Sequence, residues 1–351
     1  MFLSKNNTKG QIGIAFHDGG VTISQCSWNQ GRYVHPIAAR INQNPRDLTS
    51  ESWQTCINQA GITGSDCVLS LPPSIAHHQV LRLPNMSEQE VKEAAAWEMV
   101  DRLGVERSTL QLDAIPVGAG GDVLAIAIDQ QELSGLLDPL YAAGLRPTAI
   151  EPQCISVVRT LSMLHRRQSD LSVVQSVLDF GMHDSAFMVI AGDSLVFYKH
   201  LDHNGMQLIE AIASHTDVTF DQAERMITAS QEGEEDADIS KAVRDATRSA
   251  HESIATDAMK CMRHYGVTNR GPVSTHLIVT GSSGWNAHLA NVLETSCSQE
   301  VISDRDIQHI HALPSDTLSS SGWHIALGAS LSSVSSQRQR RGSDATVKDA
   351  A

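Results

Sequence analysis

One segment of this chain combines residue types that could bind a phosphate group and a metal ion. Asp179-Phe180-Gly181 places a carboxylate just before a glycine, and Ser185 adds a hydroxyl group shortly afterwards. Backbone N–H groups of such a turn can surround an anion, and the carboxylate can hold Mg²⁺ through water. The same pattern is also typical of an ordinary turn after a strand. We therefore predict Asp179 as a metal ligand and Asp179, Gly181 and Ser185 as a phosphate site, with the plain turn as the alternative.

Two further glycine-containing segments could take part in the same chemistry. The first, His17-Asp18-Gly19-Gly20, offers a carboxylate and two flexible glycines between two predicted strands. The second follows a predicted strand and precedes a predicted helix over 286–294, so helix N–H groups could meet an anion or a nucleoside there. The residues of these two candidate sites are Asp18, Gly19, Gly20, Gly281, Ser282, Ser283 and Gly284.

Other catalytic and metal-binding patterns are not present in the sequence. Gly281-Ser282-Ser283-Gly284 is one residue too short for a nucleophile elbow, and no Gly-x-x-x-x-Gly-Lys-Ser/Thr segment occurs. The six cysteines are widely spaced and the 16 histidines have no thiolate or carboxylate partner at helical spacing. We therefore expect reduced thiols, surface or core histidines, and neither a hydrolase triad nor a P-loop.

The elements that position the candidate residues occur twice along the chain. Each copy has three alternating strands joined by short turns, then a helix, then a further apolar strand. The copies begin near Gln11 and Val173, and each has His-Asp at its first turn. This internal duplication predicts two similar α/β halves.

Additional material lies inside the first copy. The segment over about 76–146 contains further strands and helices, one of which starts at Ser87 with Glu90 three residues later, a capping-box pattern. We predict a first half over 1–170 with this small α+β subdomain inserted, a second half over 171–331, and a polar, disordered tail over 332–351.

Composition excludes several classes of protein. The chain has 351 residues, 41% of them hydrophobic, which suits two packed domains. Its net charge of −14 argues against nucleic acid or an anionic bilayer as a partner. No secretory leader or stretch of about 20 apolar residues occurs, so we expect a cytoplasmic protein without direct membrane insertion.

Several motifs together resemble the PilM family of type IV pilus assembly proteins, which is related to FtsA within the actin-like superfamily. The most specific runs from Leu83-Pro84-Asn85-Met86 through Ser87-Glu88-Gln89-Glu90 and is followed by Trp97-Glu98. Further matches are Ala143-Gly144-Leu145-Arg146-Pro147, Ile150-Glu151-Pro152, Val177-Leu178-Asp179-Phe180-Gly181 and Phe220-Asp221-Gln222-Ala223-Glu224. The similarity extends from about Gly13 to Leu331.

The resemblance implies a fold and a role. The fold is two duplicated actin-like (ribonuclease H-like) halves around a nucleotide cleft, with the inserted subdomain replacing one of actin's own. PilM-like proteins are cytoplasmic and bind ATP with Mg²⁺. They hold the cytoplasmic N-terminal segment of a PilN-like bitopic membrane protein in the inner-membrane platform of a pilus or a related secretion machine. Gly205 and Glu224 correspond to further nucleotide-facing positions of the superfamily.

This chain departs from the family at the phosphate-binding positions. The leading Asp of the first loop, Asp-x-Gly-Ser-Ser-Ser-x-Lys, is Ala15 or Gly13 here, and no Lys follows. The paired glycines of the second half read Asn204-Gly205, and Glu224 is not followed by the family's Lys. Each lost charge-assisted contact removes about 1.5–3 kcal/mol. We therefore expect an adaptor with weak ATP binding and no ATPase turnover.

Two alternatives remain within the superfamily. In the first, the protein is an active Mg-ATP-dependent ATPase or sugar-kinase-like enzyme, with Asp179 holding Mg²⁺ and Asp18 acting in the altered first loop. In the second, it is an FtsA-like filament former, which would need an amphipathic C-terminal helix. The tail contains arginines but hardly any large apolar residue after Val334.

Overall fold

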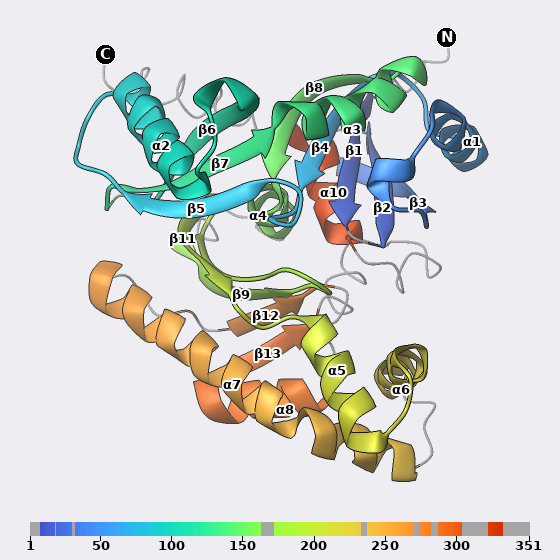
Figure 1. The fold of residues 1–351 in the computed structure, drawn as a ribbon, viewed down its shortest axis with the longest axis vertical. Coiled ribbons are helices and arrows are strands. Elements are labelled where there is room, and N and C mark those ends of the chain that lie inside the picture. The colour runs from blue at the N-terminus through green and yellow to red at the C-terminus, as the bar shows by residue number, and fades with distance from the viewer. Residues whose placement is uncertain are drawn as a thin grey trace. The chain divides into compact units, whose positions relative to one another are not determined.

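The computed structural model describes most of the chain, whose contacts divide it into two compact units (Figure 1). The described residues are 8–17, 19–29, 32–118, 120–162, 172–232, 237–269, 274, 276–281, 287–303 and 322–332. The first unit comprises Met1–Pro116, Gly121–Arg167 and Gln308–Ala351, and the second comprises Val117–Gly120 and Gln168–Ile307. Asp18, Ser282, Ser283, Gly284 and positions 333–351 of the predicted tail lie outside the described residues.

The first unit is built on a five-stranded sheet of order β3-β2-β1-β4-β8. Strands β1, β2 and β3 are antiparallel, and β4 and β8 run parallel to β1. Their bounds are β1 (Thr8–His17), β2 (Gly20–Asn29), β3 (Arg32–Ile41), β4 (Asp66–Leu71) and β8 (Arg146–Pro152). The helical elements are η1 (Pro45–Asp47), α1 (Ser50–Ala60), α3 (Gln130–Ala142), α4 (Gln153–Ser162) and α10 (Trp323–Ser330).

The side chains of β1 point alternately to the two faces of this sheet, and each face is covered by different helices. Ile12, Ile14 and Phe16 are buried in one core, where the Phe16 ring meets Trp53 of α1 edge to face at a centroid distance of 6.3 Å. Successive strand residues point to opposite faces, so Gly13 faces the other side. Helix α10 packs on that side against β1 and α4. The first unit is therefore a sheet between two helical layers.

The inserted subdomain has a small core of its own. A three-stranded sheet of order β5-β7-β6 packs against α2, whose first turn carries the predicted capping box between Ser87 and Glu90. The bounds are β5 (His77–Arg82), α2 (Glu88–Leu103), η2 (Arg107–Thr109), β6 (Leu110–Val117) and β7 (Asp122–Asp129). Helix α3, which we placed inside the insertion, instead buries Leu136 and Leu140 in the core beneath β1. The insertion's own core thus ends with β7.

Two glycines let α10 pack closely against β1 and α4 within the first unit. A Cβ atom at Gly13 would lie 2.0 Å from the carbonyl oxygen of Ala326, and one at Gly328 would lie 1.9 Å from that of Ser156 on α4. We predicted residues 171–331 as the second half, whereas α10 belongs to the first unit. Helix α10 belongs to the first unit because it packs on β1, β2, β4 and α4.

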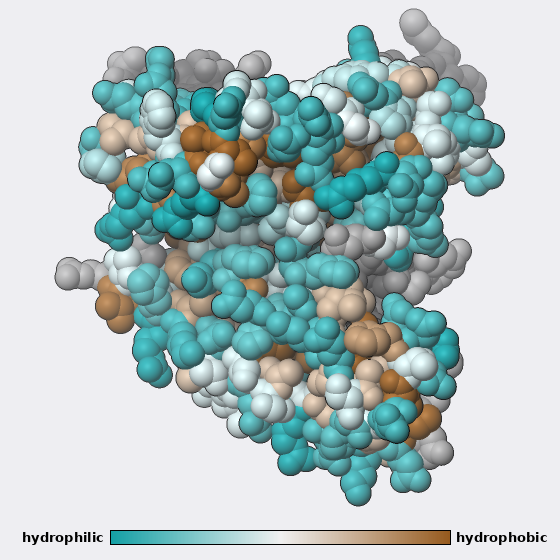
Figure 2. All heavy atoms as spheres, viewed as in Figure 1, coloured by the Kyte–Doolittle hydropathy of each residue, from teal (hydrophilic) through white to brown (hydrophobic). Residues whose placement is uncertain are grey.

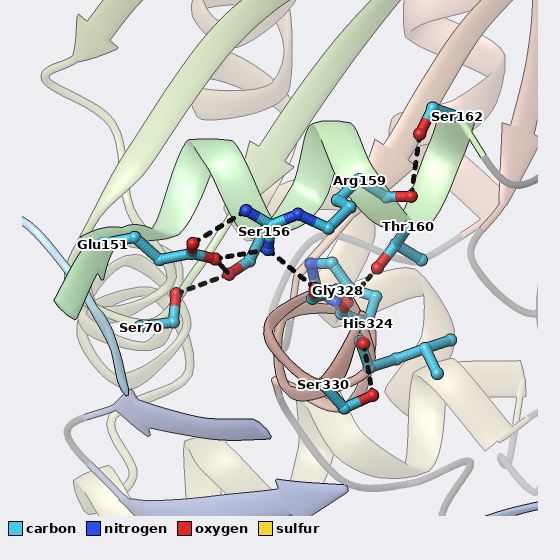
Figure 3. Close-up of polar contacts among 10 residues, drawn as sticks. Ser70, Glu151, Ser156, Arg159, Thr160, Ser162, His324, Gly328 and Ser330 are labelled. Atoms are coloured by element: carbon cyan, nitrogen blue, oxygen red, sulfur yellow. Dashed lines mark hydrogen bonds and ion pairs between the residues drawn. The ribbon is translucent and has the colours of Figure 1, made fainter. Parts of the chain in front are cut away.

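A mostly buried ion pair joins β8 to α4, and its arginine also contacts α10 (Figure 3). Arg159 binds Glu151 with both guanidinium nitrogens, at 2.7 and 2.8 Å, and also donates to the Gly328 carbonyl oxygen at 2.8 Å. The Ser156 hydroxyl donates to Glu151, and its oxygen lies 3.1 Å from the Ser70 hydroxyl oxygen. Bidentate, charge-assisted contacts fix orientation as well as distance, so Glu151 holds Arg159 in place for its hydrogen bond to α10.

The second unit repeats the strand arrangement of the first. Its sheet has the order β11-β10-β9-β12-β13, again with three antiparallel strands followed by two parallel ones. The strands are β9 (Val174–Phe180), β10 (Ser185–Ala191), β11 (Ser194–Leu201), β12 (His276–Thr280) and β13 (Glu300–Ser303). The helices are α5 (Gly205–Thr216), α6 (Phe220–Glu232), α7 (Ala237–Asn269) and α8 (Ala287–Cys297). The predicted duplication is confirmed.

All four helices contribute to the core of the second unit. Leu208, Ile227, Ile254 and Leu293 come from α5, α6, α7 and α8 in turn and are buried in one cluster with residues of β9 and β10. Helix α7 is the longest element, with 33 residues, and many of its side chains are charged. Across the described parts of the chain, no helix combines the length and apolarity that a bilayer span requires.

Replacing Gly13 with alanine tests the close packing of α10. The added methyl group would overlap backbone atoms of α10, which cannot turn aside as a flexible side chain can. We expect the free energy of unfolding to fall by about 3 kcal/mol or more, measured by urea denaturation. Gly135→Ala is the matched control, because a Cβ there meets nothing within 4 Å and should stabilise helix α3 by about 0.5–1 kcal/mol. Equal effects of the two substitutions would contradict the close packing.

Candidate functional site

The turn between β9 and β10 brings several predicted residues together. Asp179 is buried at the end of β9, with 6% of its surface exposed, and pairs in register with Thr280 of the parallel strand β12. The Thr280 hydroxyl donates to Asp179 Oδ1 at 2.9 Å. The Gly181 N–H donates to the Asp184 carbonyl oxygen at 2.9 Å and closes the turn. The predicted carboxylate is therefore held by its neighbouring strand, beside a tight turn.

The start of helix α5 is hydrogen-bonded to this turn. The N–H groups of Gly205 and Met206 donate to the carbonyl oxygens of Gly181 and Met182, at 3.0 and 2.9 Å. The helix is capped by the side chain of Asn204, which also donates to the turn. The first N–H groups of a helix have no partner within the helix and commonly bind anions. Here two of them are already used inside the protein.

Gly281 completes this group of residues from the end of β12. Its φ of +102° is one that side chains rarely adopt, and a Cβ there would lie 2.4 Å from the carbonyl oxygen of Phe180. Glycine is thus required for β12 to end beside the turn. Ser185, also in this region, has a buried hydroxyl group without a hydrogen-bond partner among the described residues. The structure therefore gathers Asp179, Gly181, Ser185, Gly205 and Gly281.

Glu224 is not joined to these residues. It lies on the exposed side of α6, and its backbone carbonyl oxygen accepts a hydrogen bond from Thr228 within the same helix. Within the described residues, no hydrogen bond or ion pair links Glu224 to the β9–β10 turn. Its predicted role facing a nucleotide remains a prediction.

The β1–β2 hairpin contains the first predicted turn. His17 and Gly20 pair across it. Gly20 has a φ of +140°, and a Cβ there would lie 2.0 Å from the carbonyl oxygen of Ile41. Gly20 is therefore required for packing against the end of β3, whereas Gly19 is exposed.

Sequence reasoning missed Arg40 beside this hairpin and gave His17 no role of its own. Ala15, Thr22 and Arg40 pair in one row across β1, β2 and β3, and His17 Nε2 lies 3.2 Å from the Thr22 hydroxyl oxygen. The Arg40 guanidinium approaches to 3.6 Å from where a Cβ of Gly19 would lie. A cation thus reaches the turn from β3, a position that only strand register reveals.

Burial controls the protonation of His17. The pKa of this imidazole falls to about 4, chiefly because burial disfavours the charged form and secondly because Arg40 lies close by. His17 is therefore neutral at pH 7 and can share one hydrogen bond with Thr22.

Asp179, beside the β9–β10 turn, is the residue that we predicted as a metal ligand. The described residues contain no group of three or more His, Cys, Asp or Glu side chains that could hold a metal ion. Ala15 is fully buried and supplies no carboxylate to the first hairpin. A cation at Asp179 would depend on water, or on a ligand such as a phosphate, for its other contacts.

Acidification should destabilise the protein through His17. Its pKa is about 4 in the folded chain and 6.5 ordinarily, so the unfolded state binds more protons between these values and stability falls as the pH falls. Relative to His17→Gln, the wild type should lose about 3 kcal/mol of unfolding free energy between pH 7 and pH 4. Urea titrations at several pH values measure this difference. Parallel pH profiles for the two proteins would show that His17 is not buried in its neutral form.

Comparisons with known proteins identify the fold. No family model and no curated protein matches the sequence. Among solved structures, "PilM-PilN type IV pilus biogenesis complex" matches with a TM-score of 0.69 and 18% identity over 92% of this chain and 98% of that chain. The ethanolamine utilization protein EutJ from Carboxydothermus hydrogenoformans matches with a TM-score of 0.51 and 11% identity, covering 92% and 89%. The chain has the duplicated actin-like fold and is similar in structure to PilM.

Proposed function

We propose that this protein is an adaptor of a type IV pilus or related secretion platform that binds the cytoplasmic N-terminal segment of a PilN-like bitopic membrane protein. The solved structure with a TM-score of 0.69 is a PilM–PilN complex, and the match covers nearly the whole of its chain. In this role the protein is cytoplasmic and lies at the inner membrane through its partner. The expected partner is an extended peptide, and capture of such a peptide requires no catalytic residue.

The observation that carries the proposal is the uncovered edge of β8. This strand is last in its sheet and, within the described residues, pairs only with β4. Thr148, Ala149 and Ile150 are all exposed, and 41% of the Ile150 surface is accessible. A free edge offers backbone donors and acceptors to an added strand, and exposed apolar side chains give it an apolar contact.

The inserted subdomain adds apolar surface to the same unit. Figure 2 shows hydrophobic side chains gathered at the surface of the first unit, over the inserted sheet beside α2. Val105, which follows α2 in the inserted subdomain, is 41% exposed, and Tyr141 on α3, elsewhere in the first unit, is 53% exposed. Exposed apolar patches on soluble proteins commonly mark interaction sites.

The nucleotide-binding positions support an adaptor more than an enzyme. Ala15 replaces a carboxylate, and two N–H groups at the start of α5 already bind the Gly181 and Met182 carbonyl oxygens. Phosphoryl transfer depends almost wholly on positioned metal and charge. These features favour weak ATP binding without turnover, and this degenerate site is part of the proposal.

An active Mg-ATP-dependent enzyme is the second candidate. Asp179, Gly181 and Gly281 lie together, and the buried Ser185 hydroxyl group points to a polar ligand in this turn. If ATP binds, Asp179 would hold Mg²⁺, and the turn N–H groups would contact phosphate oxygens.

Substituting Ile150 with lysine tests the β8 edge. A charged side chain in place of the exposed isoleucine should weaken binding of the synthetic cytoplasmic segment of a PilN-like protein at least about ten-fold, because an apolar contact worth about 1.5 kcal/mol or more is lost. Isothermal titration measures the affinity. Val267→Lys is the matched control, because Val267 is 75% exposed on α7 in the second unit. Unchanged affinity in Ile150→Lys, or an equal loss in both variants, would remove the edge from the proposal.

Substituting Asp179 with alanine separates the two candidate functions. For an adaptor, phosphate release from Mg-ATP should equal the background in both wild type and Asp179→Ala. For an ATPase, it should be measurable in the wild type and fall by about 100-fold or more in the variant. A coupled phosphate assay decides between them, and Thr280→Val controls for loss of the hydroxyl contact to Asp179.

A further inference from the structure

The outer face of α2 presents a tryptophan among carboxylates. Trp97 is 73% exposed, which makes it one of the most exposed large side chains of the described chain. Glu93 and Asp101 lie four residues before and after it, so all three share one helix face. The opposite face of the helix is occupied, because Ala95 and Met99 are buried in the inserted core. Trp97 therefore has no role in holding α2 in place.

The negative charge on this face is not neutralised within the protein. In α2, five carboxylates stand against two cations. Lys92 pairs with Glu88 and Asp113, and Arg102 lies 3.9 Å from Glu98. Glu93 accepts a hydrogen bond from the uncharged Gln89, and Asp101 makes no ion pair with any described residue. The two carboxylates beside Trp97 are therefore available to an external cation.

The carboxylates around Trp97 distinguish between the partners that could bind this exposed indole ring. An anionic bilayer surface would be repelled by Glu93 and Asp101. A second copy of the same face would bring like charges together, which costs binding energy. A basic peptide suits the face, because Lys and Arg pair with carboxylates and bind to the face of an indole ring. Figure 2 agrees in showing mostly hydrophilic side chains over α2 itself.

We infer that the Trp97 face of α2 binds the basic, membrane-proximal part of the partner's cytoplasmic segment. This inference rests on the proposed function and names a second contact for the same partner. Cytoplasmic segments next to a membrane span are enriched in Lys and Arg, so a bitopic partner brings positive charge close to the bilayer. The apolar part of the segment binds at β8, and its basic part binds at α2.

Titration of the full-length protein with two synthetic peptides tests this inference. One peptide is the cytoplasmic segment of a PilN-like protein, and the other is the same segment with every Lys and Arg replaced by Gln. The double variant Glu93→Gln/Asp101→Asn should bind the first peptide about five-fold to ten-fold more weakly and lose most of its salt dependence. Trp97→Phe keeps an aromatic ring at the same position, whereas Trp97→Ala should weaken binding by about five-fold.

The control and the readouts separate this inference from the proposed function. Asp47→Asn/Glu51→Gln makes the same change in net charge at two exposed positions of the first unit and should leave affinity unchanged. The indole N–H signal of Trp97, assigned by its loss in Trp97→Phe, should shift on addition of the basic peptide only. Equal affinity of all variants for the basic peptide would overturn the α2 contact but leave the proposed function standing. No binding of either peptide to the wild type would overturn both.

Discussion

The close contact between α10 and the β1 strand is the constraint on which the first unit depends. Gly13 and Gly328 remove the side chains that would separate the backbones, and Arg159 links Glu151 to the Gly328 carbonyl oxygen. Removing one partner of such a buried ion pair is strongly destabilising, because it leaves an uncompensated charge inside the protein. The sheet that carries the β1–β2 hairpin and the β8 edge is therefore held from its second face by a helix from the end of the chain. Both candidate surfaces of this unit depend on that support.

The two halves share a topology but differ in the residues around their first turns. In the second unit, the carboxylate and glycines remain, but the turn and the start of α5 satisfy each other's backbone groups. In the first unit, the position of the family's leading Asp is Ala15 or Gly13, while Arg40 brings positive charge to the turn from a neighbouring strand. The turn of the second unit thus has a buried carboxylate beside it, whereas the turn of the first unit has a nearby cation. Such a distribution agrees with a scaffold whose binding capacity lies at its surface.

Local patterns allowed much of this fold to be predicted. Strand alternation and turn residues gave the duplicated meanders, and the spacing of Ser87 and Glu90 gave the start of α2. The location of α10, the position of Arg40 beside Thr22, and the bonding of Gly205 to Gly181 could not be predicted in this way. Each depends on strand register or on contacts between distant residues, which composition and periodicity do not encode. For the same reason, Asp179 could be identified as a candidate ligand, but the engagement of the nearby N–H groups could not.

The route of the chain through α10 also affects how the protein is made. Ser330 contacts Cys26 across 304 residues of sequence, so the first unit contains segments that leave the ribosome at widely separated times. Its strands precede the main part of the second unit in the sequence, but the face that receives α10 stays open until α10 has also been synthesised. The second unit, apart from its short Val117–Gly120 segment, is continuous and can fold during that interval. The first unit is therefore the last to close, and a chaperone or a partner that covers β1 before α10 arrives would act on it rather than on the second unit.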